Sequence, residues 1–190
     1  MIYIPKGDEP DFLLDFKKSY PQKTYDSDEF SKFRIPLKEE LRKEQKGLCA
    51  YCCGRITQET SHNEHIEPRH PGQYESKRSL DYYNIIASCN NLKTCGNKKG
   101  NLYNKEKFVS PLDKDCEEKF TYYMDGEIEG DTYTIELLNL NDYELKNARK
   151  AVLRSLSHLE KEDISLIYMS ESSSEYPAYF NVIKWYWKTF

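Results

Sequence analysis

Two pairs of cysteines constrain this chain more than any other feature of its sequence. Two residues separate Cys49 from Cys52, and five residues separate Cys89 from Cys95. A tight turn between paired cysteines supplies two sulfur ligands, and two such turns supply the four ligands that a tetrahedral zinc ion requires. The spacing therefore predicts a structural zinc site that pins one segment of the chain to another.

The remaining cysteines and the expected compartment bear on this prediction. Cys53 is adjacent to Cys52 and can replace it after a shift of one residue, whereas Cys116 has no near partner and is expected in the core. The chain has no apolar run near the roughly 18 residues of a membrane span, and its start has no hydrophobic segment of a signal peptide. We therefore expect a cytoplasmic protein, in which reduced thiols favour metal binding over disulfides. The alternative is that the cysteines are buried as small hydrophobic residues.

The charge of the chain is uneven. Its net charge is −4, yet residues 64–107 carry eight basic and five acidic side chains, whereas residues 108–190 carry nine basic and sixteen acidic ones. Affinity for nucleic acid rises with the number of Lys and Arg contacts to phosphate. A mildly basic middle in an acidic chain therefore predicts weak binding of nucleic acid by this chain alone.

Helical periodicity appears on both sides of the cysteine pairs. One helix is expected near 9–19 and another from 36 to about 46, where Pro36 suits the first helical position and Gly47 can take the left-handed conformation that closes a helix. A polar, Ser-rich loop is expected over 170–175. The other expected elements are a hairpin over 120–128 that turns at Asp125 and Gly126, a helix over 142–160, and an apolar helix over 179–187.

Between the cysteine pairs, Glu64 and His65 are the first candidates for chemistry. An imidazole titrates near neutral pH and can take a proton from water, which hydrolysis of a phosphodiester requires. If these two residues lie on a strand, their side chains point to opposite faces and need different roles. His62 is a rival base three residues before His65, and His70 and His158 are weaker candidates.

Two asparagines and two lysines that come after His65 in the chain are further candidates for the site. Asn84 is expected to cap a helix or to fix the loop that orients the histidine. Asn97 offers an amide oxygen, a suitable hard ligand for Mg²⁺, and stands at the start of an expected short helix. The adjacent Lys98 and Lys99 are candidates for contacts to phosphate, with solvated surface lysines as the alternative.

These motifs together resemble the HNH endonucleases. The resemblance rests on Cys-x2-Cys, Glu64-His65-Ile66-Glu67-Pro68, Asp81-Tyr82-Tyr83-Asn84 and Cys95-Gly96-Asn97-Lys98-Lys99-Gly100, which cover about residues 47–105. In more detail the chain is similar to the PtuB family of the Septu anti-phage defence systems, whose relatives also accompany some retrons. The features of this closer likeness are the start Met1-Ile2-Tyr3-Ile4, the Thr94–Gly100 stretch and the Thr134–Asn141 run.

The resemblance implies an α+β fold with a ββα-metal core and a zinc knuckle, flanked by N- and C-terminal helices. It implies one domain over 1–190, made of a helical extension (1–46), the HNH core (47–105), and a hairpin with C-terminal helices (106–190). By position, His65 is the general base, Asn84 braces the loop, and Asn97 binds a catalytic Mg²⁺ or Mn²⁺. Glu64 stands where a metal ligand often precedes the base, although Asp is commoner there. Arg69, Lys98 and Lys99 are the expected contacts to nucleic acid.

The function expected on these grounds is metal-dependent cleavage of DNA, as the effector of a defence complex with an ATPase partner resembling PtuA. The sequence leaves two alternative functions open. An RNA nuclease, acting for example on tRNA, uses the same chemistry, since nothing in the sequence reads a base or a 2′-hydroxyl. A zinc-stabilised interaction module without catalytic activity is the second alternative.

Overall fold

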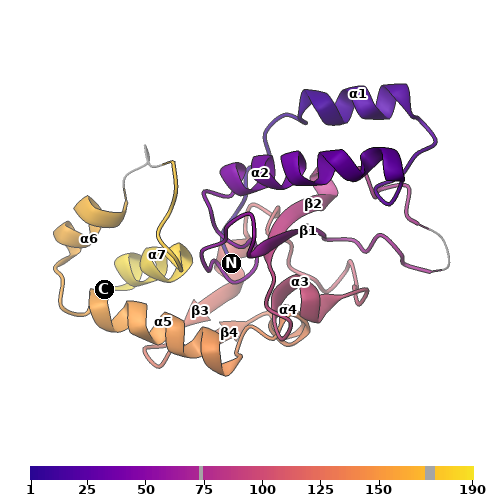
Figure 1. Cartoon of the computed structure of the whole chain (residues 1–190). Helices are drawn as coiled ribbons and strands as arrows, with labels where there is room; N and C mark the ends of the chain where they lie inside the picture. The colour runs from indigo at the N-terminus through magenta and orange to yellow at the C-terminus, as the bar shows by residue number, and fades with distance from the viewer. Residues whose placement is uncertain (73–74, 170–173) are drawn as a thin grey trace.

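The computed structural model describes residues 1–72, 75–169 and 174–190. Over this part of the chain, seven α-helices and two antiparallel sheets of two strands each make a mixed α+β fold (Figure 1). The Ser-rich loop expected over 170–175 falls mostly outside the described residues. Among the described helices, none has both the length and the apolar character needed to cross a membrane.

The N-terminal helices cover one side of the central sheet. Helix α1 (Asp11–Ser19) is followed by the 3-10 helix η1 (Asp28–Phe33) and by α2 (Arg34–Glu44), which packs on both strands of that sheet. Helix α2 ends in a Schellman motif, because the N–H groups of Lys46 and Gly47 bond back to Lys43 and Arg42. The left-handed closing residue is Lys46, with φ 54°, and not Gly47 as expected, although Gly47 also has a positive φ of 76°.

A hairpin and a short helix form the middle of the chain. Strand β1 (Ser61–His65) pairs antiparallel with β2 (Ile85–Cys89), so that His65 lies opposite Ile85 and Ser61 opposite Cys89. A long connection containing the 3-10 helix η2 (Tyr82–Asn84) joins the two strands, and α3 (Cys95–Lys99) packs against β2. The second cysteine pair therefore lies at the end of this hairpin, and the first pair lies beside it, because the N–H of Ala50 bonds to the carbonyl oxygen of Ala87 in β2.

The C-terminal part is a second hairpin surrounded by helices. Helix α5 begins at Tyr143 as expected, with the Asp142 side chain accepting a hydrogen bond from the N–H of Glu144. It ends at Leu156, so the helix expected over 142–160 is too long, and a separate helix follows it. The elements are η3 (Cys116–Lys119), β3 (Phe120–Tyr122), β4 (Ile128–Gly130), α4 (Thr132–Leu138), α5 (Tyr143–Leu156), α6 (Lys161–Tyr168) and α7 (Phe180–Thr189).

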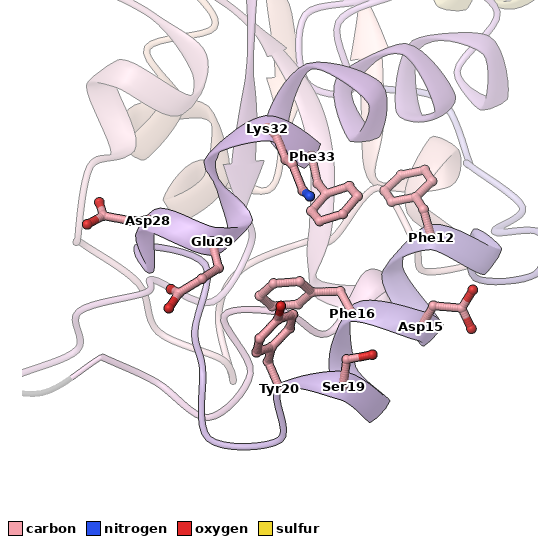
Figure 2. Close-up of a pocket in the computed structure, with 9 residues that line it drawn as sticks. All are labelled: Phe12, Asp15, Phe16, Ser19, Tyr20, Asp28, Glu29, Lys32 and Phe33. Carbon is pink, nitrogen blue, oxygen red and sulfur yellow. The ribbon is translucent and has the colours of Figure 1, made fainter.

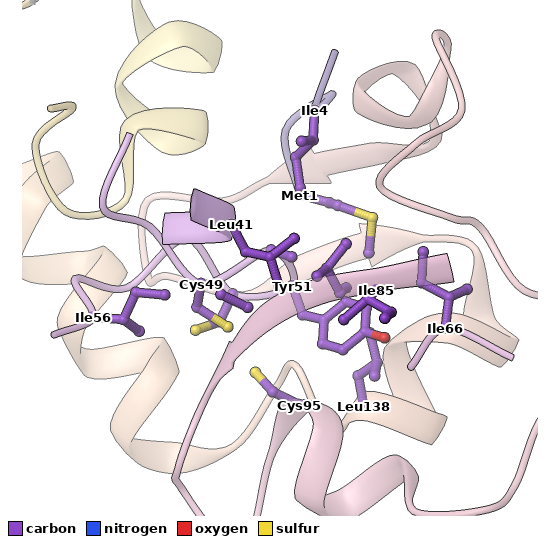
Figure 3. Close-up of a cluster of buried hydrophobic side chains, with 14 of the residues drawn as sticks. Met1, Ile4, Leu41, Cys49, Tyr51, Ile56, Ile66, Ile85, Cys95 and Leu138 are labelled. Carbon is purple, nitrogen blue, oxygen red and sulfur yellow. The ribbon is translucent and has the colours of Figure 1, made fainter. Parts of the chain in front are cut away.

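One buried cluster connects the three parts of the chain. It contains Met1 and Leu41 from the N-terminal part, Ile85 from β2, and Leu138 from α4 (Figure 3). Tyr51, which follows the first cysteine of the knuckle, is completely buried in the same cluster. The central hairpin is therefore held between helices that precede it and helices that follow it.

Helix α7 lies between two hydrophobic clusters. Val182 belongs to the main cluster, and Phe180 and Ile183 belong to a second one near α6. Trp185 packs edge-on against the ring of Tyr122 at 5.9 Å between ring centroids. The apolar surface that surrounds α7 therefore packs largely against other parts of the same chain.

The turn of the second hairpin requires glycine. Gly126 has φ 88°, and a Cβ atom there would lie 2.0 Å from the carbonyl oxygen of Lys146. We expect Gly126→Ala to lower the free energy of unfolding by about 2 kcal/mol or more, through backbone strain and this clash. Denaturant unfolding measures the effect, with Gly72→Ala as the control because nothing lies within 4 Å of its Cβ position. Equal effects of the two substitutions would contradict this explanation.

Candidate functional site

The four predicted cysteines meet in one cluster. Cys49 and Cys52 lie in the turn after α2, Cys89 ends β2, and Cys95 begins α3. All four sulfur atoms lie within 4.8 Å of one another. Sulfurs that share a tetrahedral zinc ion at about 2.3 Å from each are about 3.8 Å apart. The donor set and its spacing therefore fit a metal such as zinc.

The local backbone is shaped around these sulfurs. The N–H group of Cys89 lies 3.3 Å from the Cys49 sulfur, and that of Gly54 lies 3.4 Å from the Cys52 sulfur. Cys95 adopts a left-handed conformation with φ 57°, which costs on the order of 1–3 kcal/mol unless the surroundings compensate. A metal that fixes the Cys95 sulfur provides such compensation.

The thiols of the cluster differ in acidity. Burial raises the pKa of Cys49, but hydrogen bonds from Cys52, Cys89 and Cys95 outweigh burial, and its pKa lies well below the usual range. The pKa of Cys95 is held well above that range, chiefly by its hydrogen bond to Cys49. Negative charge is thus concentrated on part of the cluster, and a dication allows all four sulfurs to bind as thiolates.

The two remaining cysteines lie outside this cluster. Cys53 is completely buried among the hydrophobic side chains near α6, and desolvation raises its pKa to about 11. Burial likewise raises the pKa of Cys116 to about 12. The choice between Cys52 and Cys53 is therefore settled in favour of Cys52.

A second polar site opens beside the hairpin. A cavity of about 240 Å³ lies between β1, the connection that follows it, and α3. Its wall includes many of the residues outside the cysteine cluster that the sequence singled out. The lining side chains include His62, Glu64, His65, Arg69, His70 and Asn97, and Gly96 contributes backbone.

His65 is buried and held in one orientation. It is 4% exposed, and its Nε2 donates a hydrogen bond to the carbonyl oxygen of Ser79 at 2.8 Å. The ring of Tyr25 packs edge-on against it, with 4.8 Å between ring centroids. Burial lowers the pKa of His65 to about 4, so the ring is uncharged near neutral pH. Because Nε2 carries the proton, Nδ1 keeps its lone pair, and no other described residue forms a hydrogen bond to it.

Glu64 forms an ion pair in the interior. Its Oε1 lies 2.9 Å from Nζ of Lys99, a lysine with a side chain that is only 1% exposed. The same ammonium donates to the carbonyl oxygen of His65 at 3.0 Å. Burial raises the pKa of Glu64, but His62 and Lys99 outweigh it, and the net pKa is lowered. Lys99 therefore neutralises Glu64 and has no surface at which to meet a phosphate, so its predicted contact to nucleic acid does not fit this structure.

The ion pair gives a prediction for stability. Lys99→Ala leaves the Glu64 carboxylate buried without its cation, and we expect a loss of about 3 kcal/mol or more in the free energy of unfolding. The exposed neighbour Lys98 is the matched control, and Lys98→Ala should change stability by less than about 0.5 kcal/mol. Denaturant titration of both variants decides the matter, and a similar loss in each would contradict the structural role of Lys99.

The predicted site residues Asn84, Asn97 and Arg69 each have different contacts. Asn84 ties the end of the long connection to its start, because its side chain accepts from the N–H of Glu67 at 2.8 Å and donates to the carbonyl oxygen of Glu67 at 3.0 Å. Asn97 is exposed, and its amide nitrogen donates to the carbonyl oxygen of Asn91 at 3.3 Å. Arg69 lies over the ring of Tyr25 at 4.9 Å from its centroid. It also forms an ion pair with Asp26.

The structure gives His62, the rival base, a different position from the one expected, and it adds Asn90 and Gly96, to which the sequence assigned no role. His62 faces Glu64, with 3.6 Å between Nε2 and Oε2. Asn90 Oδ1 lies 2.9 Å from Nδ1 on the other side of the His62 ring, and Gly96 lies close to both His62 Nε2 and Glu64 Oε2. The spacing of His62 and Glu64 on a predicted strand was a usable signal, because residues two apart share a face.

A separate aromatic cavity lies between α1 and η1. It has a volume of about 440 Å³ and is lined by aromatic rings such as Phe16 and Tyr20, with carboxylates such as Asp15 at its edge (Figure 2). Among the described residues that line it there is no histidine, no cysteine and none of the predicted site residues.

No protein-family model matches the chain, and no curated protein matches it either. A function for the chain therefore has to follow from its residues and their geometry.

Proposed function

We propose that the chain is a metal-dependent endonuclease of the HNH type, similar to PtuB, that hydrolyses phosphodiester bonds in DNA. The observation that carries the proposal is the pair Glu64 and His65 on the cavity wall: a paired carboxylate next to an uncharged imidazole with a fixed orientation. This combination is suited to holding a divalent cation and activating a water molecule side by side.

His65 acts as the general base. Its Nε2 proton is held by the carbonyl oxygen of Ser79, so the free lone pair on Nδ1 is the one available to accept a proton from water. Lys99 fixes the backbone at this point by donating to the carbonyl oxygen of His65, and Asn84 fixes the connection that follows. The imidazole is therefore oriented before a substrate binds, which lowers the reorganisation that the reaction requires.

Glu64 is the residue that holds the divalent cation. Its Oε1 is engaged by Lys99, whereas its Oε2 faces the space above Gly96, which carries no side chain to fill it. Asn97, the second ligand expected from sequence, lines the same cavity from α3. A divalent cation there supplies positive charge to the phosphate as negative charge develops in the transition state.

The distribution of charge supports a nuclease that works with a partner. Arg69 lines the cavity, the exposed Lys98 follows the lining residue Asn97 in the chain, and both are suited to contact phosphates. The net charge of −4 is unfavourable for tight binding of DNA by the chain alone. We therefore include in the proposal an ATPase partner resembling PtuA, in an anti-phage defence complex where this chain is the effector.

The proposal is tested with two substrates. The zinc-loaded chain is incubated with plasmid DNA and, separately, with total RNA, each with Mg²⁺ or Mn²⁺ and with or without a co-expressed ATPase of the PtuA kind. We expect cleavage of the plasmid that requires the divalent cation and increases with the ATPase. Cleavage of RNA alone would replace DNA with RNA as substrate, and no cleavage of either would leave a zinc-stabilised binding module.

A further inference from the structure

His62 and Glu64 face each other at a distance that suggests a shared ion. Residues two apart on β1 project to one face of the strand, and His62 Nε2 lies 3.6 Å from Glu64 Oε2. This separation is too long for a hydrogen bond. Two donor atoms bound to one cation at about 2.1 Å are about 3.0 Å apart when adjacent and about 4.2 Å apart when opposite. The observed separation lies between these two values.

The lone pair of His62 is aimed at Glu64 by a chain of hydrogen bonds. Asn90 donates through its amide nitrogen to the carbonyl oxygen of Glu59 at 2.9 Å, which leaves its Oδ1 as the acceptor for His62. His62 Nδ1 lies 2.9 Å from that oxygen and therefore carries the ring proton. Histidines that ligate metals are commonly fixed in this way, with the second nitrogen donating to a carbonyl or carboxylate oxygen.

Gly96 leaves room for the ion. A Cβ atom at this position would lie 2.8 Å from Glu64 Oε2 and 2.9 Å from His62 Nε2. The two donor atoms therefore converge on the one place in α3 where the chain has no side chain. Any larger residue at position 96 fills the space in front of both donors.

Asn97 is less well placed than His62 to bind the divalent cation. Its side chain is exposed, and its amide nitrogen donates to the carbonyl oxygen of Asn91, which precedes α3. His62, by contrast, is partly buried and faces the carboxylate directly.

From these observations we infer that His62 and Glu64 are the protein ligands of the divalent cation, and that Asn90 is a positioning residue that fixes the His62 ring. The inference deepens the proposed function and rests on it for the role of the cation. An imidazole nitrogen in the ligand set favours a transition-metal ion over Mg²⁺, which prefers oxygen donors. Mn²⁺ should therefore bind at least about tenfold more tightly than Mg²⁺.

The test measures binding of Mn²⁺ itself, without reference to activity. Zinc-loaded full-length protein is titrated with Mn²⁺ and the free ion is followed by electron paramagnetic resonance. We expect His62→Ala to weaken binding at least about tenfold, as loss of a ligand or its support does. His70→Ala is the matched control, because His70 lines the same cavity but bonds to Asp26. Zinc content and thermal unfolding establish that each variant is folded.

Two further variants separate a metal site from general stability. Gly96→Ala should weaken Mn²⁺ binding by filling the space, while keeping zinc. Asn90→Ala should weaken it about 10-fold or more, and Asn90→Asp should restore it, because a carboxylate also accepts from His62 Nδ1.

The outcomes distinguish this inference from the proposed function. Loss of Mn²⁺ binding in Asn97→Ala with full binding in His62→Ala would overturn the ligand assignment and leave the nuclease proposal intact. Absence of Mn²⁺ binding in the wild-type chain would overturn the inference as well. Normal Mn²⁺ binding that depends on His62, in a chain that cuts neither DNA nor RNA, would support the site and refute the nuclease.

Discussion

The purified chain should contain about one equivalent of zinc, and Cys49→Ser should lose both the zinc and the folded structure of the central region. Structural zinc sites contribute on the order of 10–16 kcal/mol of binding free energy, which equals or exceeds the whole stability of a typical domain, about 5–15 kcal/mol. Cys49 is completely buried, and the cluster joins the turn after α2 to β2 and α3. Elemental analysis and circular dichroism measure the two effects.

Cys116→Ser is the matched control for this prediction. Cys116 is also buried, but it lies outside the four-cysteine cluster, so its substitution should lower stability without releasing zinc. A folded, fully reduced wild-type sample without zinc would contradict the account of the cluster. So would a Cys49→Ser variant that unfolds at the same temperature as the wild type.

The second large effect is expected at His65. Replacement by Ala or Gln should lower the rate of DNA cleavage by at least about 10²-fold, the lower end of what a general base contributes. Zinc should be retained, since His65 is not part of the cysteine cluster. Single-turnover cleavage at saturating Mn²⁺ is the appropriate measurement, because it isolates the chemical step from binding of the cation.

Two comparisons make the His65 result specific. His158→Ala removes an exposed histidine far along the chain and should leave the rate unchanged. His65→Gln tests whether a side chain of similar length, which cannot act as a base at neutral pH, keeps the fold when Ala does not. Cleavage at the wild-type rate in a folded His65→Gln variant would show that another group activates water.

Much of the fold was predictable because its signals are local. The periodicity of α1 and α5 and the cap at Asp142 depend on residues within one or two turns. The spacing of the cysteines predicted which four would meet, up to the choice between Cys52 and Cys53. The structure resolves that choice through backbone geometry, since Cys53 turns into the hydrophobic cluster near α6.

The candidate site was less predictable, because its contacts join distant residues. His62 and Asn90 meet only because β1 pairs with β2, and no local pattern indicates that Asn90 orients a histidine. Lys99 appeared in a basic stretch typical of a phosphate contact, yet it is buried against Glu64. A sequence gives the charge of a lysine, but whether that charge meets solvent or a buried carboxylate is decided by packing.

The central claim is that the cavity beside Glu64 and His65 is where a water molecule attacks a phosphodiester. Cleavage of plasmid DNA in ¹⁸O-labelled water tests it most directly, with the zinc-loaded chain, Mn²⁺ and the ATPase partner present, and with mass spectrometry of the new DNA ends. We expect cuts that carry one ¹⁸O atom in each newly formed terminal phosphate and that form at least about 10²-fold more slowly in His65→Gln. An uncut plasmid with a folded, zinc-loaded chain and its partner, or cuts that contain no label, would contradict the account.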